Sequence, residues 1–362
     1  MKKFIIGPDV LKPALKKLGM VVNEKTILPI TKNMLCKVGS NEIEFITTDT
    51  EMTIAYKCVC ETGPSEPFEL LIPYKFFHDI VSLNSQEPVS VELVNDKKAK
   101  ITCAEDLYEL KSLEPVDKFP KVDAVPRKAS LTLDDSFVNL LQLAMLTTAT
   151  NDTHPAFTRA CLDLGNEKSR LVSTDGNMMF THYLNVKAAA EEQIHFSKRM
   201  AKAVEGMEQL ELSWNSKTVC MQNAVLTVWC RRYEDRYPNY KGVIPDYTPT
   251  LEINKVNIEN ALNKALIVGN IAQQTTIHLQ KEKGYIHFES IDDDKVRKIN
   301  SRVEASNTGA VEKIALNAKK LLTILNQVEC QTIRLHIHDA SKAVLISSTE
   351  NEDYLGLIMP LV

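Results

Sequence analysis

A pattern of apolar and turn residues occurs three times along this chain of 362 residues, and internal repetition limits the possible folds more than any other feature. Phe45–Ile54 reads FITTDTEMTI, and Leu171–Leu184 reads LVSTDGNMMFTHYL. In both segments an apolar strand leads into a Thr-Asp corner, and a second strand headed by Met follows. A third corner is expected at Ile291-Asp292. We therefore predict a β-hairpin at each of the three places.

Each corner is preceded by a segment whose apolar residues have the i, i+3, i+4, i+7 spacing of a helix. The first residue of that face lies 38 residues before Asp49, 38 before Asp175 and 34 before Asp292. The three faces are Leu11, Ala14, Leu15 and Leu18; Phe137, Leu140, Leu141 and Ala144; and Ile258, Ala261, Leu262 and Ala265.

Each copy has a second half, in which a short helix is followed by strand-like runs and then by an aromatic residue or Met before Pro. The helices are expected within Ile72–Leu83, Phe196–Met207 and Leu316–Val328. Agreement of three registers over about a hundred residues predicts a triplicated α+β domain of ordinary size. The predicted domains are residues 1–122, 128–246 and 247–362, joined rigidly by the short Pro-containing linkers Pro120–Pro126 and Pro245–Pro249.

Charge is distributed unevenly although the net charge is only −4. Basic residues gather on the predicted helices, and acidic residues gather in turns and strands. One interpretation is a set of solvated helix faces; the other is that the helices share one positive face of the molecule. No apolar run is long enough for a membrane span or a signal peptide, so we expect a cytoplasmic protein. The eight scattered cysteines form no C-x-x-C pair and are expected to be buried thiols in a reducing compartment.

Motifs of catalysis are sparse. The phosphate-binding, dinucleotide-binding, zinc-protease and nucleophile-elbow patterns do not occur in the sequence. His336 and His338 alternate on a predicted strand and share a face, which leaves a metal site open as a minor alternative. Asp134-Asp135 precedes a helix and is explained as an N-cap with a first-turn charge. These patterns call for neither an enzyme nor a cofactor, and they leave an enzyme open.

Several segments together resemble the bacterial DNA polymerase III beta subunit, the sliding clamp, over the whole chain. TTDTEMTI and STDGNMMF are similar to corner segments of that family, and IPYKFFHDIV to one of its helices. The most specific matches are DRYPNYKGVIP and the terminal YLGLIMPLV.

The resemblance implies three tandem clamp domains, each with two helices on the inner side and antiparallel sheets outside, in a head-to-tail dimer that forms a closed ring. Such a ring is a processivity factor that encircles duplex DNA. Lysine and arginine on the inner helices would hold phosphates loosely, through water and without reading sequence. The DNA-facing candidates, chosen by helix position, are Lys12, Lys16, Lys17, Lys25, Lys75, Lys198, Arg199 and Lys202.

The resemblance also implies two protein interfaces. The dimer interface maps to Tyr108 and Leu110 in one chain and to Ile267 and Val268 in the other. Short peptide motifs of the replicative polymerase catalytic subunit, the clamp loader and repair proteins would bind an apolar groove that adaptable Met side chains suit. The groove residues, carried over by position, are Phe157, Thr174, Gly176, Met178, Met179, Pro238, Val243, Ala343, Leu357, Met359, Pro360 and Val362.

This sequence departs from the family pattern around that groove. Asn177-Met178 stands in place of His-Arg, Gly242 in place of Arg, Gln273 in place of Phe, and Lys320 in place of Tyr. We therefore expect a more apolar and less cationic groove with a shifted peptide preference. Two alternatives to a clamp are a metal-dependent nucleic-acid enzyme that uses His336 and His338, and a single-stranded nucleic-acid binding module. The second would need aromatic residues on a basic strand face, and the aromatic content is only 6%.

Overall fold

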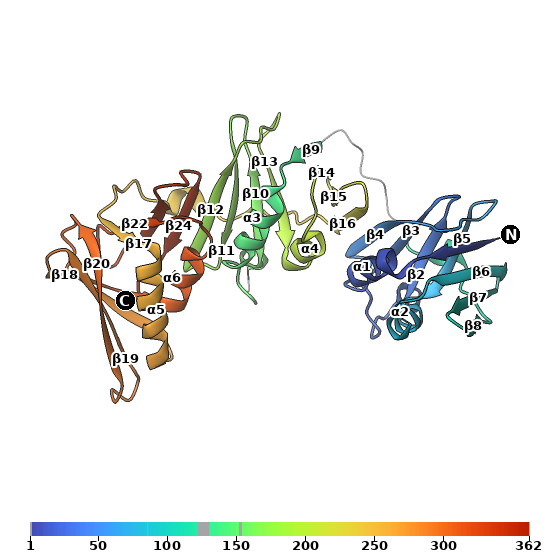
Figure 1. Cartoon of the computed structure of the whole chain (residues 1–362). Helices are drawn as coiled ribbons and strands as arrows, with labels where there is room; N and C mark the ends of the chain where they lie inside the picture. Colours follow the sequence, from blue (N-terminus) through green and yellow to red (C-terminus); the bar gives the residue numbers. More distant parts are fainter. Residues whose placement is uncertain (1, 85, 122–129, 152–153, 362) are drawn as a thin grey trace. The chain divides into compact units, whose positions relative to one another are not determined.

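The computed structural model describes residues 2–84, 86–121, 130–151 and 154–361 (Figure 1). The chain divides into two compact units. Unit 1 consists of Met1–Val138 and Arg199–Tyr233, and unit 2 consists of Asn139–Lys198 and Glu234–Val362. The predicted linker Pro120–Pro126 lies largely outside the described residues, as does Val362.

The order of helices and strands repeats three times, as strand, helix, four strands, helix, three strands. The first repeat is β1 (Lys3–Ile6), α1 (Pro8–Leu18), β2 (Asn33–Val38), β3 (Glu42–Thr48), β4 (Met52–Val59), β5 (Phe68–Pro73), α2 (Tyr74–Leu83), β6 (Val89–Asn95), β7 (Lys98–Cys103) and β8 (Asp106–Leu110). The second is β9 (Ser130–Leu133), α3 (Ser136–Met145), β10 (Arg159–Leu164), β11 (Ser169–Thr174), β12 (Met178–Leu184), β13 (Glu192–Ser197), α4 (Lys198–Val204), β14 (Leu210–Trp214), β15 (Thr218–Gln222) and β16 (Leu226–Arg231). The third is β17 (Leu251–Asn254), α5 (Lys255–Val268), β18 (Gln274–Glu282), β19 (Tyr285–Ile291), β20 (Lys298–Asn307), β21 (Lys313–Asn317), α6 (Ala318–Leu325), β22 (Thr332–His336), β23 (Val344–Ser348) and β24 (Tyr354–Ile358). The predicted helices and corners are confirmed.

Antiparallel strand pairs join successive repeats into continuous sheets. Unit 1 holds a four-stranded sheet, β1-β6-β7-β8, and an eight-stranded sheet, β5-β2-β3-β4-β16-β15-β14-β9. Unit 2 holds a twelve-stranded sheet, β13-β10-β11-β12-β24-β23-β22-β17-β20-β19-β18-β21. In each unit the strand that follows an Asp corner pairs with the last strand of the next repeat: β4 with β16, and β12 with β24.

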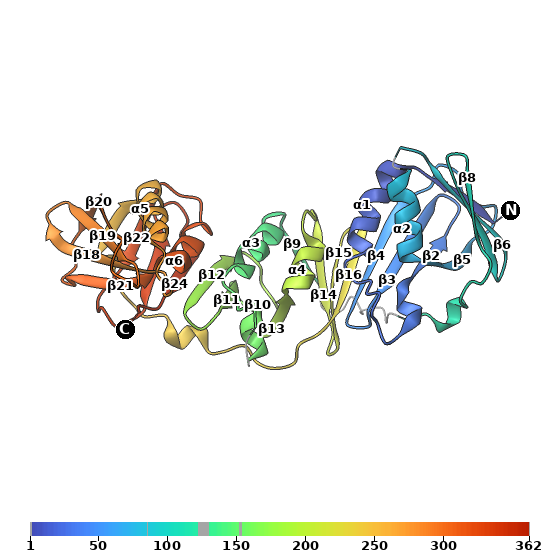
Figure 2. The ribbon, with the colours of Figure 1, turned by 90° about the horizontal axis from the view of Figure 1, so that it is seen from below.

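The helices cover one face of these sheets with the apolar faces that the sequence predicts. In unit 1, α1 packs on β3 and β4 and contacts α2, which lies beside it in Figure 2. Leu11, Leu15 and Leu18 of α1 are at most 2% exposed, and the hydrophobic core of the unit lies between this helix pair and the strands.

The Asp corner is a carboxylate-capped turn. Asp49 Oδ1 accepts hydrogen bonds from the backbone N–H groups of Glu51 (3.1 Å) and Met52 (2.8 Å). Asp175 Oδ1 accepts from Asn177 (2.9 Å) and Met178 (2.8 Å) in the same way. A carboxylate at this position fixes the turn because it satisfies two N–H groups that the ladder leaves unpaired.

The second oxygen of the corner carboxylate binds a cation from the next repeat. Arg199 of α4 forms an ion pair with Asp49 Oδ2, and Lys320 Nζ of α6 lies 2.8 Å from Asp175 Oδ2. One carboxylate therefore shapes the turn with one oxygen and ties two repeats together with the other.

Replacing Asp49 by Ala should lower the free energy of unfolding by about 1–3 kcal/mol, because two backbone N–H groups and the Arg199 guanidinium lose their acceptor. Asp49→Asn keeps an oxygen for the N–H groups and loses only the charge, so it should cost less. Urea unfolding followed by circular dichroism measures both. Equal stability of Asp49→Ala and the unmodified chain would contradict the role of this corner.

Candidate functional site

Exposed basic residues lie on the helices of unit 1. Lys12 and Lys16 are exposed on α1, four residues apart and on the face opposite the buried leucines. Lys25 is exposed in the loop that follows. Lys75 of α2 is exposed and forms an ion pair with Asp79, with 3.1 Å between Nζ and Oδ2. In this unit, exposed lysines therefore lie on α1, in its following loop and on α2.

Other predicted DNA-facing cations are used within the protein. Lys17 Nζ donates to the carbonyl oxygens of Ala203 (2.9 Å) and Glu205 (2.7 Å), at the C-terminal end of α4, where helix carbonyls lack partners. Burial lowers the pKa of Lys17, with Glu205 acting in the opposite direction. Arg199 is held by Asp49, and Lys198 Nζ lies 3.4 and 3.3 Å from the carbonyl oxygens of Thr148 and Ala149.

Four of the eight candidates are exposed and form neither an ion pair nor a side-chain hydrogen bond with another described residue. These are Lys12, Lys16, Lys25 and Lys202. The sequence alone did not separate them from Lys17 and Arg199, because a lysine or arginine on a helix is normally solvated whether or not it has a second role.

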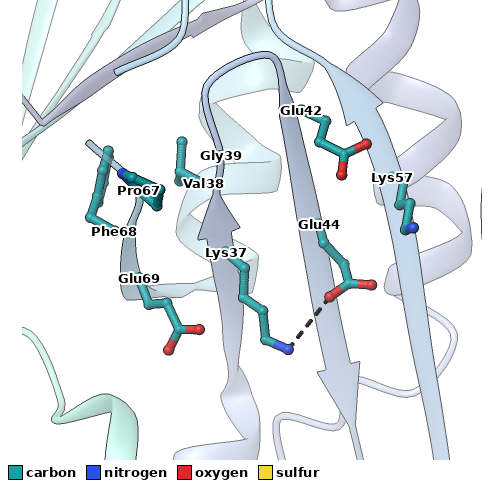
Figure 3. A pocket seen from close by; sticks show the side chains of 9 residues that line it. All are labelled: Lys37, Val38, Gly39, Glu42, Glu44, Lys57, Pro67, Phe68 and Glu69. Atoms are coloured by element: carbon teal, nitrogen blue, oxygen red, sulfur yellow. Dashed lines mark ion pairs between the residues drawn. The ribbon is translucent and has the colours of Figure 1, made fainter. Parts of the chain in front are cut away.

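The face of the unit 1 sheet that points away from α1 carries charges of both signs (Figure 3). Cys58 Sγ of β4 contacts the Val10 carbonyl of α1, so the neighbouring Lys57 points to the opposite face. There Lys37, Glu44 and Lys57 lie in register on three adjacent strands, and Lys37 Nζ is 3.5 Å from Glu44 Oε2. This shallow pocket is lined by two lysines, Lys37 and Lys57, and by three glutamates, Glu42, Glu44 and Glu69, so it offers no net positive charge to a ligand.

The β12–β24 junction of unit 2 brings several predicted groove residues together. Met178 lies opposite Ile358, and Met179 lies between Thr174 on one side and Leu357 on the other. The Met359 N–H donates to the Asn177 carbonyl (2.8 Å), beside the corner that holds Gly176. Ala343 directly precedes β23, the other neighbour of β24. Met178, Met179, Leu357 and Pro360 are buried, whereas Met359 is 39% exposed.

The remaining described groove candidates, Phe157, Pro238 and Val243, lie on segments fixed to β10. Phe157 is in the short 3-10 helix Pro155–Thr158 that leads into β10. The Tyr237 hydroxyl donates to the Arg159 carbonyl (3.3 Å), and the Tyr240 hydroxyl donates to Asp163 Oδ2 (2.6 Å). The DRYPNYK motif thus anchors a loop through two tyrosines, and Val243 at its end is 57% exposed.

Asp163 is the charged centre of this anchor. Lys241 Nζ lies 2.8 Å from Asp163 Oδ2, the oxygen that also accepts from Tyr240. Burial alone would raise the pKa of Asp163, but the hydrogen bonds from Lys241 and Tyr240 outweigh it, and the pKa falls below 3.8. Sequence reasoning missed Asp163, because Tyr240 follows it by 77 residues and Lys241 comes one residue later.

The predicted dimer-interface residues lie in different surroundings. Tyr108 and Leu110 are half-buried on β8, a strand at the edge of its sheet, and Tyr108 packs edge-on against Phe76 of α2 with 6.1 Å between ring centroids. Ile267 on α5 is 79% exposed. Val268 is 6% exposed and packs within its own unit, so Ile267 alone offers a free apolar side chain at this position.

The two strand histidines bind protein atoms. His336 interacts through Nδ1 with the Tyr247 carbonyl (2.7 Å) and through Nε2 with Ser347 Oγ (2.8 Å), and His338 Nε2 with the Thr248 carbonyl (2.8 Å). Across residues 2–361 as described, no three His, Cys, Asp or Glu side chains gather in a way that could hold a metal ion. The eight cysteines are free thiols.

No helix in the described part of the chain is long and apolar enough to cross a membrane.

Comparison with known proteins gives one consistent result. Residues 2–123 match the family described as DNA polymerase III beta subunit, N-terminal domain, and residues 241–362 match its C-terminal domain. The beta sliding clamps of Vibrio cholerae and Pseudomonas putida are each 21% identical to this chain, with 99% of both chains covered. The solved DNA polymerase III subunit beta of Pseudomonas aeruginosa, 20% identical, superposes with a TM-score of 0.89 over 99% of both chains.

The structure therefore has the fold of the DNA polymerase sliding clamps, with three α+β clamp repeats. The chain belongs to the DNA polymerase III beta subunit family.

Asp163→Asn should lower the free energy of unfolding by about 1–2 kcal/mol at pH 7, because the charge-assisted bonds from Lys241 and Tyr240 weaken. Since the folded-state pKa of Asp163 is lowered, its contribution is present above 3.8 and is lost as the pH falls through the folded value. The stability of the unmodified chain should thus fall more steeply on acidification than that of the variant. Urea unfolding at several acidic pH values measures this, with Asp235→Asn as the control for net charge. Parallel pH profiles would contradict the assignment.

Proposed function

We propose that this protein is a DNA sliding clamp that works as a head-to-tail homodimer, a closed ring around duplex DNA that tethers the replicative polymerase. Each chain contributes three clamp domains, residues 1–122, 128–246 and 247–362. The observation that carries the proposal is the threefold element order with strand pairing between successive repeats, in a chain of the beta subunit family. As a processivity factor in the cytoplasm, it needs no catalytic residue and no cofactor.

Ring closure between two chains is supported by the strands that remain at sheet edges. Within the described residues, β8 pairs with β7 alone, and the first part of β20 pairs with β19 alone. These are the strands that correspond to β16 and β4, which pair within the chain. Tyr108 and Leu110 beside one edge and Ile267 beside the other would fill the apolar side of the junction.

DNA is held by topology and weak phosphate contacts in this proposal. Lys12, Lys16, Lys25 and Lys202 supply mobile charges toward the duplex, and Lys75 and Lys198 add to them. Lys17 and Arg199 also face this side, but their main role is to fix α1 and α4. Long, solvated side chains contact phosphates without reading bases, so the ring slides.

The double variant Lys12→Gln with Lys16→Gln distinguishes retention by encirclement of DNA from retention by attraction to its phosphates. Binding to short linear duplex should weaken, and the slope of log affinity against log salt should fall by about two, because two phosphate contacts are lost. Clamp already loaded on a nicked circle should stay bound at high salt in both proteins and should leave when the circle is cut.

Lys37→Gln with Lys57→Gln, on the sheet face that points away from α1, is the matched control and should leave the salt slope unchanged. Gel filtration of the loaded circles before and after cutting measures retention. Escape of the unmodified protein from intact circles at high salt would refute the encircling function.

The β12–β24 junction is proposed as the partner-peptide groove, lined by Phe157, Thr174, Gly176, Met178, Met179, Pro238, Val243, Ala343, Leu357, Met359, Pro360 and Val362. Polymerase, clamp loader and repair proteins would insert short apolar motifs there. Exposed Met359 and Val243 stand at the rim, and buried Met179, which lies opposite Leu357, supplies an adaptable floor.

Met359→Ser should weaken the binding of a fluorescent peptide with two adjacent large apolar side chains by about tenfold, since a buried thioether contact is lost. Fluorescence anisotropy measures the dissociation constant. Val225→Ser, at an exposed apolar residue of the β15–β16 turn, should leave the constant unchanged. An unaffected Met359→Ser protein would place the groove elsewhere.

A further inference from the structure

The free edges of β8 and β20 differ in their charged side chains. β8, Asp106–Leu110, contains two carboxylates and no basic residue. The run from Arg297 to Arg302, which includes the start of β20, contains three basic residues and no acid, and each of the three is ion-paired with a carboxylate of its own chain. If these edges meet between two chains, as the proposed ring requires, an acidic strand lies against a basic one.

The two junctions inside the chain define the register of such a pairing on the β20 side. Met52 and Met178, whose N–H groups donate to the corner carboxylates, lie opposite Cys230 and Ile358. Arg297 has the same position at the third corner, because its N–H donates to Asp292 Oδ1 at 2.9 Å. Arg297 is therefore the counterpart of Met52 and Met178.

The sheet ladders define the register on the β8 side. Ile6 and Ile253 each lie two residues before the first helix of their repeat, so they correspond. In the first repeat Ile6 pairs with Val89, which pairs with Cys103. In the third repeat Ile253 pairs with Ile333, which pairs with Ser348. Four residues before Cys103, Ala99 pairs with Leu110; four residues before Ser348, Val344 pairs with Ile358. Leu110 is thus the counterpart of Ile358, and it belongs opposite Arg297.

We infer that Lys298 of one copy and Glu109 of the other form a cross-strand ion pair at each ring junction, in the register that sets Ile299 opposite Tyr108. The inference rests on the proposed dimer and adds the contact that aligns its edges. Lys298 is suited to the role because its side chain is 53% exposed and its Nζ lies 2.7 Å from Glu289 on β19, which leaves donors for a second carboxylate.

Burial in the internal junctions supports this register. Ile54 and Phe180, the counterparts of Ile299, are 0% exposed where they lie at a completed junction. Ile299 is only partly buried in the single chain, and opposite Tyr108 it would be covered in the same way. Side chains alternate along a strand, so Lys298 and Glu109 then share the other face.

Alternative registers are disfavoured by charge. A shift of two residues in one direction sets Lys298 against Lys111, and a shift of two in the other sets it against Leu107. The first places like charges opposite each other, and the second leaves the ammonium without a partner across the junction. A shift of one residue would turn Ile299 away from the apolar side.

A charge exchange tests the pairing in the full-length protein. Glu109→Lys and Lys298→Glu should each raise the dimer dissociation constant by about a hundredfold, because the like charges act at both junctions of the ring, about tenfold at each. An equimolar mixture of the two variants restores an opposite pair at both junctions and should dimerise again with nearly the unmodified constant. Sedimentation velocity over a concentration series measures all four samples. Glu105→Lys, in the turn before β8, makes the same charge change outside the register and should shift the constant by less than about threefold.

The outcomes separate the pairing from the ring itself. If either single variant dimerises as the unmodified protein does, or if the mixture stays monomeric, the Lys298–Glu109 pairing is wrong while the dimer stands. If the unmodified protein sediments as a monomer at every concentration, the proposed ring fails and the pairing fails with it. Recovery of the dimer only in the mixture supports the pairing.

Discussion

Main-chain hydrogen bonds between repeats are the interactions on which this structure depends. A strand edge exposes a row of N–H and C=O groups that must be paired or protected, and every repeat here ends in such edges. Pairing β4 with β16 and β12 with β24 satisfies them and joins the repeats into long sheets. The cores under the helices are local, but the alignment of one repeat with the next is set by these ladders.

The corner carboxylates make that alignment specific. Asp49 and Asp175 each stand where a hairpin turns into a junction strand, and each binds a cation that belongs to the neighbouring repeat. A strand ladder alone could slip by two residues without losing many hydrogen bonds. An ion pair at its end opposes such a slip, because the carboxylate and the cation meet in one register only.

Periodicity explains why much of the fold could be predicted from the sequence. The helical faces around Leu11 and Ile258 and the Thr-Asp corners are local patterns, and three copies of each reinforce one another. Long-range partners have no such signal. In the sequence Lys17 resembles any solvated lysine, and only the structure shows its contact with the end of α4. Nothing in the sequence links Asp163 to Tyr240, because their contact depends on how the loop folds onto β10. Val268 follows exposed Ile267 directly, and only the packing of α5 shows that its side chain is buried.

The charged side chains of the free edges disfavour some assemblies of the chain. If two β8 strands met antiparallel, they would bring Asp106 and Glu109 of both copies near one another, and two β20 edges would bring Arg297 and Lys298 of both copies near one another. Contacts between two β8 edges or between two β20 edges are therefore disfavoured, and so is aggregation of chains through such contacts. The favoured contact is the heterologous one, between the β8 edge of one chain and the β20 edge of another. The two ends of each chain are therefore not equivalent in an assembly.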